Sequence, residues 1–352
     1  MVIFAGARHA LLVCFSLLPA LVFAQTTPAE FAEMSLQELL TLSTEETPQT
    51  HKRWSWSLRY QQAQFEGYLD GSETLSLDEV LFVPGGEVRS AKNFPVVPTV
   101  IKQRATIFGI NYQWRERWRV SLALPYVQQE TAHISIVPGY QQFLLKTHGI
   151  GDITLATRFR LYADPDESLH ANLGLSLPVG SIDEQGDTPR APGEQQLPYT
   201  MQLGSGTWDF PIALSYRLTG AHDVRVDVAA NIRTGQNDRH YRLGNRYSVK
   251  AKYQRPISDS VNVALGVELS HTDRIHGADE SLLVATAFPY PAGITNPDMY
   301  GGRKALASVG FAWQYSADMN LSVEFAKPLY QHLNGPQPQE RWRGAVMLSR
   351  TL

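Results

Sequence analysis

From Lys52 to its last residue, the sequence alternates between apolar side chains and polar or small ones with a period of two. Between residues 208 and 218 every second side chain is apolar, and the residues between them are small or polar. A period of two places the two sets on opposite faces of a β-strand. The polar set includes ionised groups in mid-strand, such as Asp209 and Arg217. Lipid on one face of the sheet and water on the other explains both sets at once.

A soluble sandwich and a membrane barrel both produce such alternation, but their connections differ. The expected strands cover residues 54–60, 103–114, 118–126, 152–161, 171–177, 208–218, 223–233, 246–253, 261–269, 307–315, 321–325 and 342–352. Connections after the even-numbered strands are short, and those after the odd-numbered strands are mostly longer. Bacterial outer-membrane barrels show this segregation, with short turns in the periplasm and long loops outside. The alternation and the connection lengths therefore predict that residues 51–352 form an all-β, antiparallel transmembrane β-barrel of about 12 strands.

The first 24 residues have the pattern of a secretory signal. Arg8 and His9 precede an apolar run over residues 10–23, and Ala24 supplies a small residue at the expected cleavage point. The single cysteine, Cys14, lies inside this run, so the exported chain is expected to have no disulfide. No later apolar run is long enough for a membrane helix, so a spanning structure must be a barrel.

Residues 25–50 form a separate periplasmic segment with no barrel alternation. Ser35 and Glu38 have the spacing of a capping box, and Leu36, Leu39 and Leu40 would form an apolar stripe. The pattern predicts a short amphipathic helix. Two roles for it stay open, a mobile periplasmic tail and a helix that tethers to the barrel or fills its lumen.

Charged residues within the strands share the parity opposite to the apolar rows. An Arg or Lys that faced lipid near the midplane would cost about 2 to 4 kcal/mol, so these residues are expected to face inward. The expected lumen-lining residues are Arg53, Arg59, Asp152, Arg158, Arg160, Asp209, Arg217, Arg225, Asp227, Lys250, Lys252, Glu268 and Glu324. Their mixed signs fit either a hydrated pore or a plug of cross-strand salt bridges. Twelve strands leave more room than the smallest barrels, which favours a narrow pore.

No arrangement in the sequence satisfies the needs of catalysis or of a metal site. Ser205 lies in Gly-Ser-Gly, which lacks the spacing of a nucleophile elbow. His271, Asp273 and His276 could bind a metal or act as acid and base, although a solvated loop is expected there. The acidic residues near Asp183 lack the regularity of a calcium loop. We therefore expect no enzyme, metal or cofactor, and a net charge of −3 gives no sign of nucleic-acid binding.

Four short passages suggest a family. They are Gly149-Ile150-Gly151-Asp152, Leu177-Pro178-Val179-Gly180, Gln202-Leu203-Gly204-Ser205-Gly206-Thr207-Trp208-Asp209 and Tyr241-Arg242-Leu243-Gly244-Asn245. Together they resemble the outer-membrane transporters associated with meta-cleavage pathways of phenol degradation. The resemblance covers roughly residues 51–352. It implies a β-barrel and the passage of aromatic or other small molecules, and it supplies no catalytic or binding residue.

The sequence thus predicts a porin-like channel or transporter in the outer membrane of a Gram-negative bacterium, for passive passage of small molecules that include aromatic or hydrophobic compounds. Its expected partners are membrane lipid, lipopolysaccharide, small solutes and the outer-membrane assembly machinery. The chain ends in Leu352 rather than in the Phe that this machinery usually recognises. Two alternatives stay open, an outer-membrane hydrolase and a structural or adhesive barrel that acts through long extracellular loops.

Overall fold

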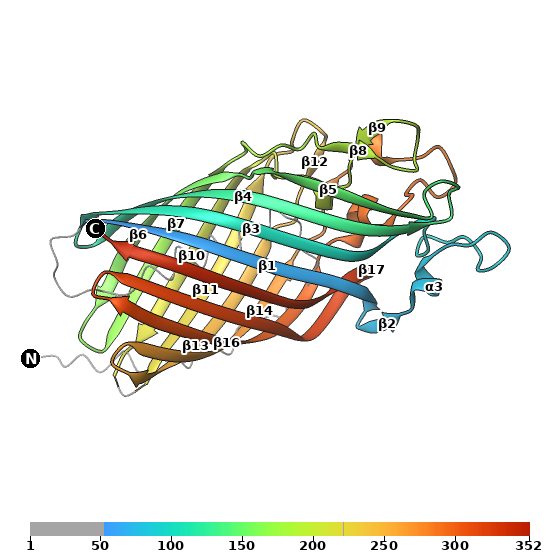
Figure 1. Cartoon of the computed structure of the whole chain (residues 1–352). Helices are drawn as coiled ribbons and strands as arrows, with labels where there is room; N and C mark the ends of the chain where they lie inside the picture. The colour runs from blue at the N-terminus through green and yellow to red at the C-terminus, as the bar shows by residue number, and fades with distance from the viewer. Residues whose placement is uncertain (1–52, 221) are drawn as a thin grey trace, which may run out of the picture.

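The structure, a computed structural model, describes residues 53–220 and 222–352. These residues form a closed antiparallel β-barrel, which confirms the predicted all-β class (Figure 1). The predicted signal peptide at 1–24 and the predicted helix within 25–50 lie outside the described residues. In the described ranges, no helix combines the length and apolar character needed to cross a membrane.

Eleven strands form the wall, each antiparallel to its neighbours, and pairing of the last with the first closes the ring. In ring order they are β1 (Trp54–Gly71), β3 (Val96–Arg115), β4 (Trp118–Ser135), β6 (Ile153–Ala163), β7 (Glu167–Leu177), β10 (Trp208–Leu218), β11 (Asp223–Thr234), β13 (Arg246–Ser258), β14 (Val261–Thr272), β16 (Gly302–Ser316) and β17 (Met319–Thr351). Figure 1 shows β1, in blue, beside β17, in red.

Shorter elements extend this wall or belong to its loops. Two strands pair with the wall, β2 (Glu73–Leu75) with β1 and β5 (Gln142–Ile150) with β4. The loops contain α3 (Leu77–Val80), β8 (Gln185–Asp187), β9 (Glu194–Gln196), η2 (Tyr199–Met201), β12 (Tyr241–Arg242), β15 (His276–Gly277), η3 (Glu280–Leu282), η4 (Gly293–Thr295) and η5 (Pro297–Met299).

The last strand, β17, folds back on itself. It is 33 residues long, and its first part pairs with β16 while its second part pairs with β1. Gln331 Nε2 donates to the Glu340 carbonyl oxygen at 2.9 Å, although residues so spaced in a straight strand lie about 30 Å apart. The reversal lies near Gly335, whose φ of 79° is accessible to glycine at little cost. Because β17 fills two adjacent places in the ring, the predicted number of about 12 strands is close.

Each expected strand overlaps an observed one, but the observed strands extend further. β1 continues to Gly71 instead of ending near Tyr60, and β3 begins at Val96, so both project beyond the segments predicted from alternation. β5 was not predicted as a strand at all. The sequence also predicted a long connection between the last two expected strands, residues 321–325 and 342–352. This prediction was wrong, because the turn around Gly335 is short.

The two faces of the wall have opposite character. In β1 the outward side chains of Leu58 and Tyr60 are each 43% exposed, whereas Ser57 and Arg59 between them are 5% and 6% exposed. The same alternation holds in β10, where Phe210 points outward and Asp209 is buried. Apolar side chains therefore cover the outside and polar ones face the interior, the reverse of a water-soluble barrel.

The connections segregate to the two ends of the barrel. Short turns such as 116–117 and 259–260 lie at one end, which we call the short-turn end, together with the C-terminus (Figure 1). Longer connections such as 72–95, 178–207 and 273–301 lie at the other, the long-loop end. The predicted sorting of short and long connections is thus present, with the turn inside β17 as the exception.

Candidate functional site

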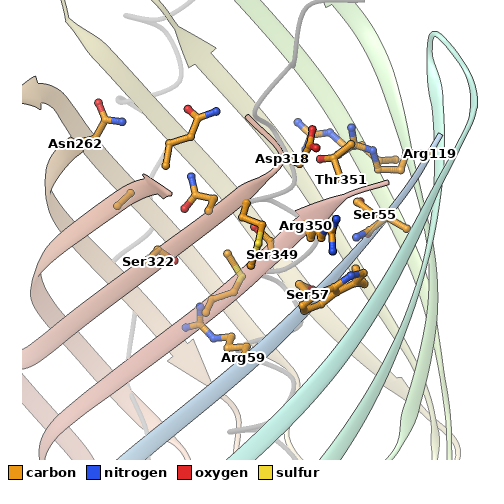
Figure 2. A pocket seen from close by; sticks show the side chains of 18 of the residues that line it. Ser55, Ser57, Arg59, Arg119, Asn262, Asp318, Ser322, Ser349, Arg350 and Thr351 are labelled. Atoms are coloured by element: carbon orange, nitrogen blue, oxygen red, sulfur yellow. The ribbon is translucent and has the colours of Figure 1, made fainter. Parts of the chain in front are cut away.

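A cavity of about 710 Å³ occupies the barrel interior toward the short-turn end. The turn residues Glu116, Arg117, Ala317 and Asp318 border it, so it reaches that end of the barrel. We call this cavity the vestibule. Figure 2 shows side chains from several strands around it, including Arg59 on β1 and Arg119 on β4.

The vestibule has an excess of positive charge, although the whole chain carries a formal net charge of −3. Its basic lining residues are Arg53, Arg59, Arg117, Arg119, Arg158, Arg160, Lys252 and Arg350, and its acidic ones are Glu116, Asp318 and Glu324. A concave, low-dielectric wall with one dominant sign of charge concentrates ions of the opposite sign. The vestibule is therefore suited to anions.

The residues predicted to line the lumen fall into two groups. Those that line the vestibule are Arg53, Arg59, Arg158, Arg160, Lys252 and Glu324. Those outside its lining are Asp152, Asp209, Arg217, Arg225, Asp227, Lys250 and Glu268. Most of this second group form ion pairs, such as Arg225 with Asp227 at 2.9 Å and Lys250 with Glu324 at 2.7 Å. That any of these residues controls passage stays a prediction.

Some charged residues of the interior were not among the predicted lumen-lining residues. Arg119 has the inward parity, because its neighbours Trp118 and Val120 belong to the outward row. Alternation alone could have identified it. Arg233 also follows the inward parity of β11, and its side chain is completely buried.

One sector of the wall neutralises its own charges. Lys304 and Arg343 each contact the buried Glu340 at 2.6 Å, while Arg246 contacts Glu268 at 2.9 Å. These side chains come from β13, β14, β16 and β17. Charge-assisted hydrogen bonds between them lock adjacent strands together, so this network is suited to holding the wall rather than to binding a mobile ion.

The opposite sector brings arginine side chains together. Arg119 of β4 lies directly across from Arg158 of β6, and Arg160 lies directly across from His170 of β7. We call Arg119, Arg158 and Arg160 the arginine row. Like charges at directly opposed positions repel each other, so a carboxylate or another anion beside them is favoured electrostatically.

A segment of the connection between β7 and β10 folds into the barrel. We call residues 197–207 the inward loop. Within it, the Met201 sulfur accepts hydrogen bonds from Gln129 Nε2 and Thr131 Oγ1, both at 3.3 Å, and the Met201 carbonyl accepts one from Thr147 Oγ1 at 2.8 Å. These three donors are buried side chains of β4 and β5. The inward loop therefore lies against the inner face of the wall and narrows the interior.

Asp152 anchors the inward loop. It lies in the break between β5 and β6, where its two carboxylate oxygens accept hydrogen bonds from the backbone N–H groups of Gly180 at 2.9 Å and Ser205 at 2.7 Å. The loop passes close to the backbone here. A Cβ atom on Gly204 would lie 2.4 Å from the Gly180 carbonyl oxygen, so no larger residue fits without movement.

The four sequence passages that suggested a family meet around this anchor. Asp152, Gly180 and Ser205 come from three of them. Arg233 connects the fourth passage to the third. Its side chain forms an ion pair with Asp209 of the third passage and donates a hydrogen bond to the Gly244 carbonyl of the fourth. These passages therefore fix the path of the loops within the barrel.

At the long-loop end of the barrel, the long connections pack against one another and form what we call the loop layer. Its buried core consists of Tyr199, Tyr241, Leu243, Ile275, Leu282 and Tyr300. Arg239 joins two connections by ion pairs with Asp183 at 2.6 Å and Asp279 at 3.2 Å. Burial raises the pKa of the Tyr199 and Tyr241 hydroxyl groups above the usual range, so both stay neutral at physiological pH. The long-loop end is thus an ordered structure.

The residues weighed for catalysis or metal binding have structural contacts. Ser205 Oγ donates to the Thr207 carbonyl at 3.1 Å, and His271 Nε2 lies 2.9 Å from Asp273 Oδ1. His276 is exposed on β15. Across residues 53–220 and 222–352, no three His, Cys, Asp or Glu side chains converge as metal ligands would.

Comparison with known proteins relates the fold to outer-membrane barrels. No protein-family model matches the chain, and no curated protein sequence matches it. The crystal structure of an outer-membrane channel from Pseudomonas putida F1 is similar, with a TM-score of 0.57 and 15% identity over 88% of this chain and 98% of that one. At this identity the likeness establishes the fold. The translocator domain of the autotransporter NalP from Neisseria meningitidis is more distant, with a TM-score of 0.46 and 9% identity over 92% of this chain and 97% of that one.

Proposed function

We propose that this protein is a channel of the bacterial outer membrane through which small molecules pass passively. The observation that carries the proposal is the reversal of its faces, with apolar rows outside and a charged vestibule inside. A wall of this kind is stable when lipid surrounds it and water fills its interior. The similar fold of the Pseudomonas putida channel supports the same conclusion.

Aromatic side chains mark one expected membrane boundary at the short-turn end. Trp54 packs against Tyr112 and Trp118 against Phe159 in tilted arrangements, with ring centroids 4.6 and 4.5 Å apart, and both tryptophans are exposed. Tryptophan and tyrosine favour the interface between lipid and water because each combines an apolar ring with a polar group. We infer that the short-turn end faces the periplasm, with membrane lipid at the wall and lipopolysaccharide around the long loops.

The proposed path runs through the vestibule, past the inward loop and through the loop layer. The inward loop is the constriction on this path, because it contacts the inner wall through Met201. Solute size would then be limited there, and solute charge would be sensed in the vestibule. Export by a signal peptide and insertion by the assembly machinery belong to the same proposal, as does passage of aromatic compounds.

Reconstitution tests the channel directly. Folded protein in liposomes should admit small polar solutes, with the rate falling as solute size increases. Folding is checked by the shift in gel migration between unheated and boiled samples that closed barrels commonly give. Liposomes prepared with boiled protein serve as the control. Properly folded protein that produces neither solute flux nor ion conductance would show that the barrel is not a channel.

A further inference from the structure

We propose that the vestibule selects and binds small organic carboxylates, with the arginine row as the binding group. This deepens the proposed channel function and rests on it for the role in transport, while binding itself can be measured separately. The first support is the charge of the lining, where basic side chains outnumber acidic ones. The second is the arrangement of the arginine row.

The arginine row concentrates positive charge at one place on the wall. Arg119, Arg158, Arg160 and Arg225 all lie close enough to act electrostatically on His170. Arg158 is only 5% exposed, and the Nε of Arg119 is oriented by a hydrogen bond of 2.9 Å to Gln113 Oε1. A guanidinium group presents a planar fork of donors that matches the two oxygens of a carboxylate. Positioned guanidinium groups on adjacent strands therefore suit a carboxylate better than a spherical ion.

The facing wall suits the rest of such a molecule. β16 stands across the ring from β6, and it presents Gly310 and Ala312 to the vestibule. Met347 lines the vestibule farther along the ring, on β17. Beside them, Lys252 and Glu324 also line the vestibule and form an ion pair with each other at 3.0 Å, so the charges at this part of the wall offset each other. A ligand with its carboxylate at the arginine row would have its uncharged body toward this wall, within a cavity large enough for a small molecule.

Charge matching is tested by ion selectivity in planar bilayers. Under a gradient of potassium chloride, the wild-type channel should favour chloride over potassium. The double variant Arg158→Gln with Arg160→Gln should lower the anion-to-cation permeability ratio by about threefold or more. The matched control is Arg274→Gln, since Arg274 is 61% exposed in a connection at the long-loop end and does not line the vestibule. Its permeability ratio should equal that of the wild type.

Binding is measured independently of conduction. Fluorine NMR of 4-fluorobenzoate should show line broadening with folded, detergent-solubilised protein, and 4-fluorobenzamide should show much less. The double variant should lose the broadening by benzoate, and added salt should weaken it. Arg160→Lys keeps the charge but not the fork, so it should retain anion selectivity and bind benzoate more weakly.

The two proposals fail in different ways. Flux without anion selectivity, or equal broadening of benzoate and benzamide, overturns the carboxylate site and leaves the channel. Benzoate binding that depends on the arginine row, in protein that conducts nothing, leaves the site and overturns the channel. If the double variant does not fold, two results still test the carboxylate site. They are the comparison of benzoate with benzamide in the wild type and the weaker benzoate binding expected of Arg160→Lys.

Discussion

Asp209 of β10 and Arg233 of β11 lie directly opposite each other and form an ion pair of 3.1 Å, with both side chains completely buried. Thr207 Oγ1 also donates to Asp209 at 2.7 Å. The pair joins the start of β10, which follows the inward loop, to the end of β11, where the connection to β13 begins. It therefore ties two loops to the barrel wall at a single point.

Removal of one partner leaves the other charge buried. We expect Asp209→Leu to lower the free energy of unfolding by about 3 to 5 kcal/mol, and the double variant with Arg233→Met to recover most of this loss. The control is Arg217→Gln, because the Arg217–Asp223 pair is partly exposed and should contribute at most about 1 kcal/mol. Denaturant unfolding in detergent measures the stability of all three variants relative to the wild type. Equal losses for Asp209→Leu and Arg217→Gln would contradict this view of the buried pair.

Loss of the anchor should release the inward loop. Asp152→Ala removes the acceptor of two backbone hydrogen bonds, each of which contributes about 1.5 to 3 kcal/mol when the acceptor is charged. Trypsin should then cleave after Arg190 in the same connection at least about tenfold faster, and conductance should rise. The control is Glu194→Ala, which removes an exposed carboxylate of that connection. It should change neither the rate of cleavage after Arg190 nor the conductance. Unchanged cleavage in the Asp152 variant would mean that other contacts fix the loop.

Close backbone packing at the anchor predicts a strict need for glycine. In Gly204→Ala the new Cβ would meet the Gly180 carbonyl and the Asp152 carboxylate at 2.4 and 2.6 Å, so the loop must shift. We expect a loss of about 1 to 3 kcal/mol in stability and faster proteolysis of the loop. Gly310→Ala is the control, because its nearest neighbour would lie at an ordinary 3.5 Å. Similar behaviour of the two variants would contradict the packing argument.

Two loop tyrosines should resist ionisation. Burial raises the pKa of Tyr199 and Tyr241 above the ordinary value of 10.0, so their stabilising effect is fully present below that pH and is lost as the pH rises through the folded values. At about pH 11 the tyrosinate absorbance of folded Tyr241→Phe should equal that of the folded wild type. In denaturant the variant should show one tyrosinate fewer. A lower tyrosinate absorbance in the folded variant than in the folded wild type would show that the Tyr241 hydroxyl is accessible to solvent.

The sequence by itself determined the class of fold, the approximate positions of the wall strands and the face on which each of their residues lies, although it missed β5 and the full length of β1 and β3. Period-two alternation is a local property, since neighbouring residues of a strand point to opposite sides whatever the strand pairs with. The inward parity of Arg59, Arg158 and Lys252 could therefore be predicted without knowing any neighbour. Most short turns and long connections were equally visible, because turn residues signal their own conformation, and the turn within β17 was the exception.

Only the tertiary structure decided which inward residues meet. Alternation gives a face but no register, so it could not show that Arg119 faces Arg158 while Asp209 faces Arg233. The inward loop was also invisible, because its path depends on the Asp152 carboxylate, which lies about fifty positions earlier in the chain. Long-range hydrogen bonds and ion pairs have no period in the sequence. For this reason the wall could be predicted from the sequence, whereas the separation of the interior into a basic vestibule, a neutralised network and a loop held against the inner wall could not.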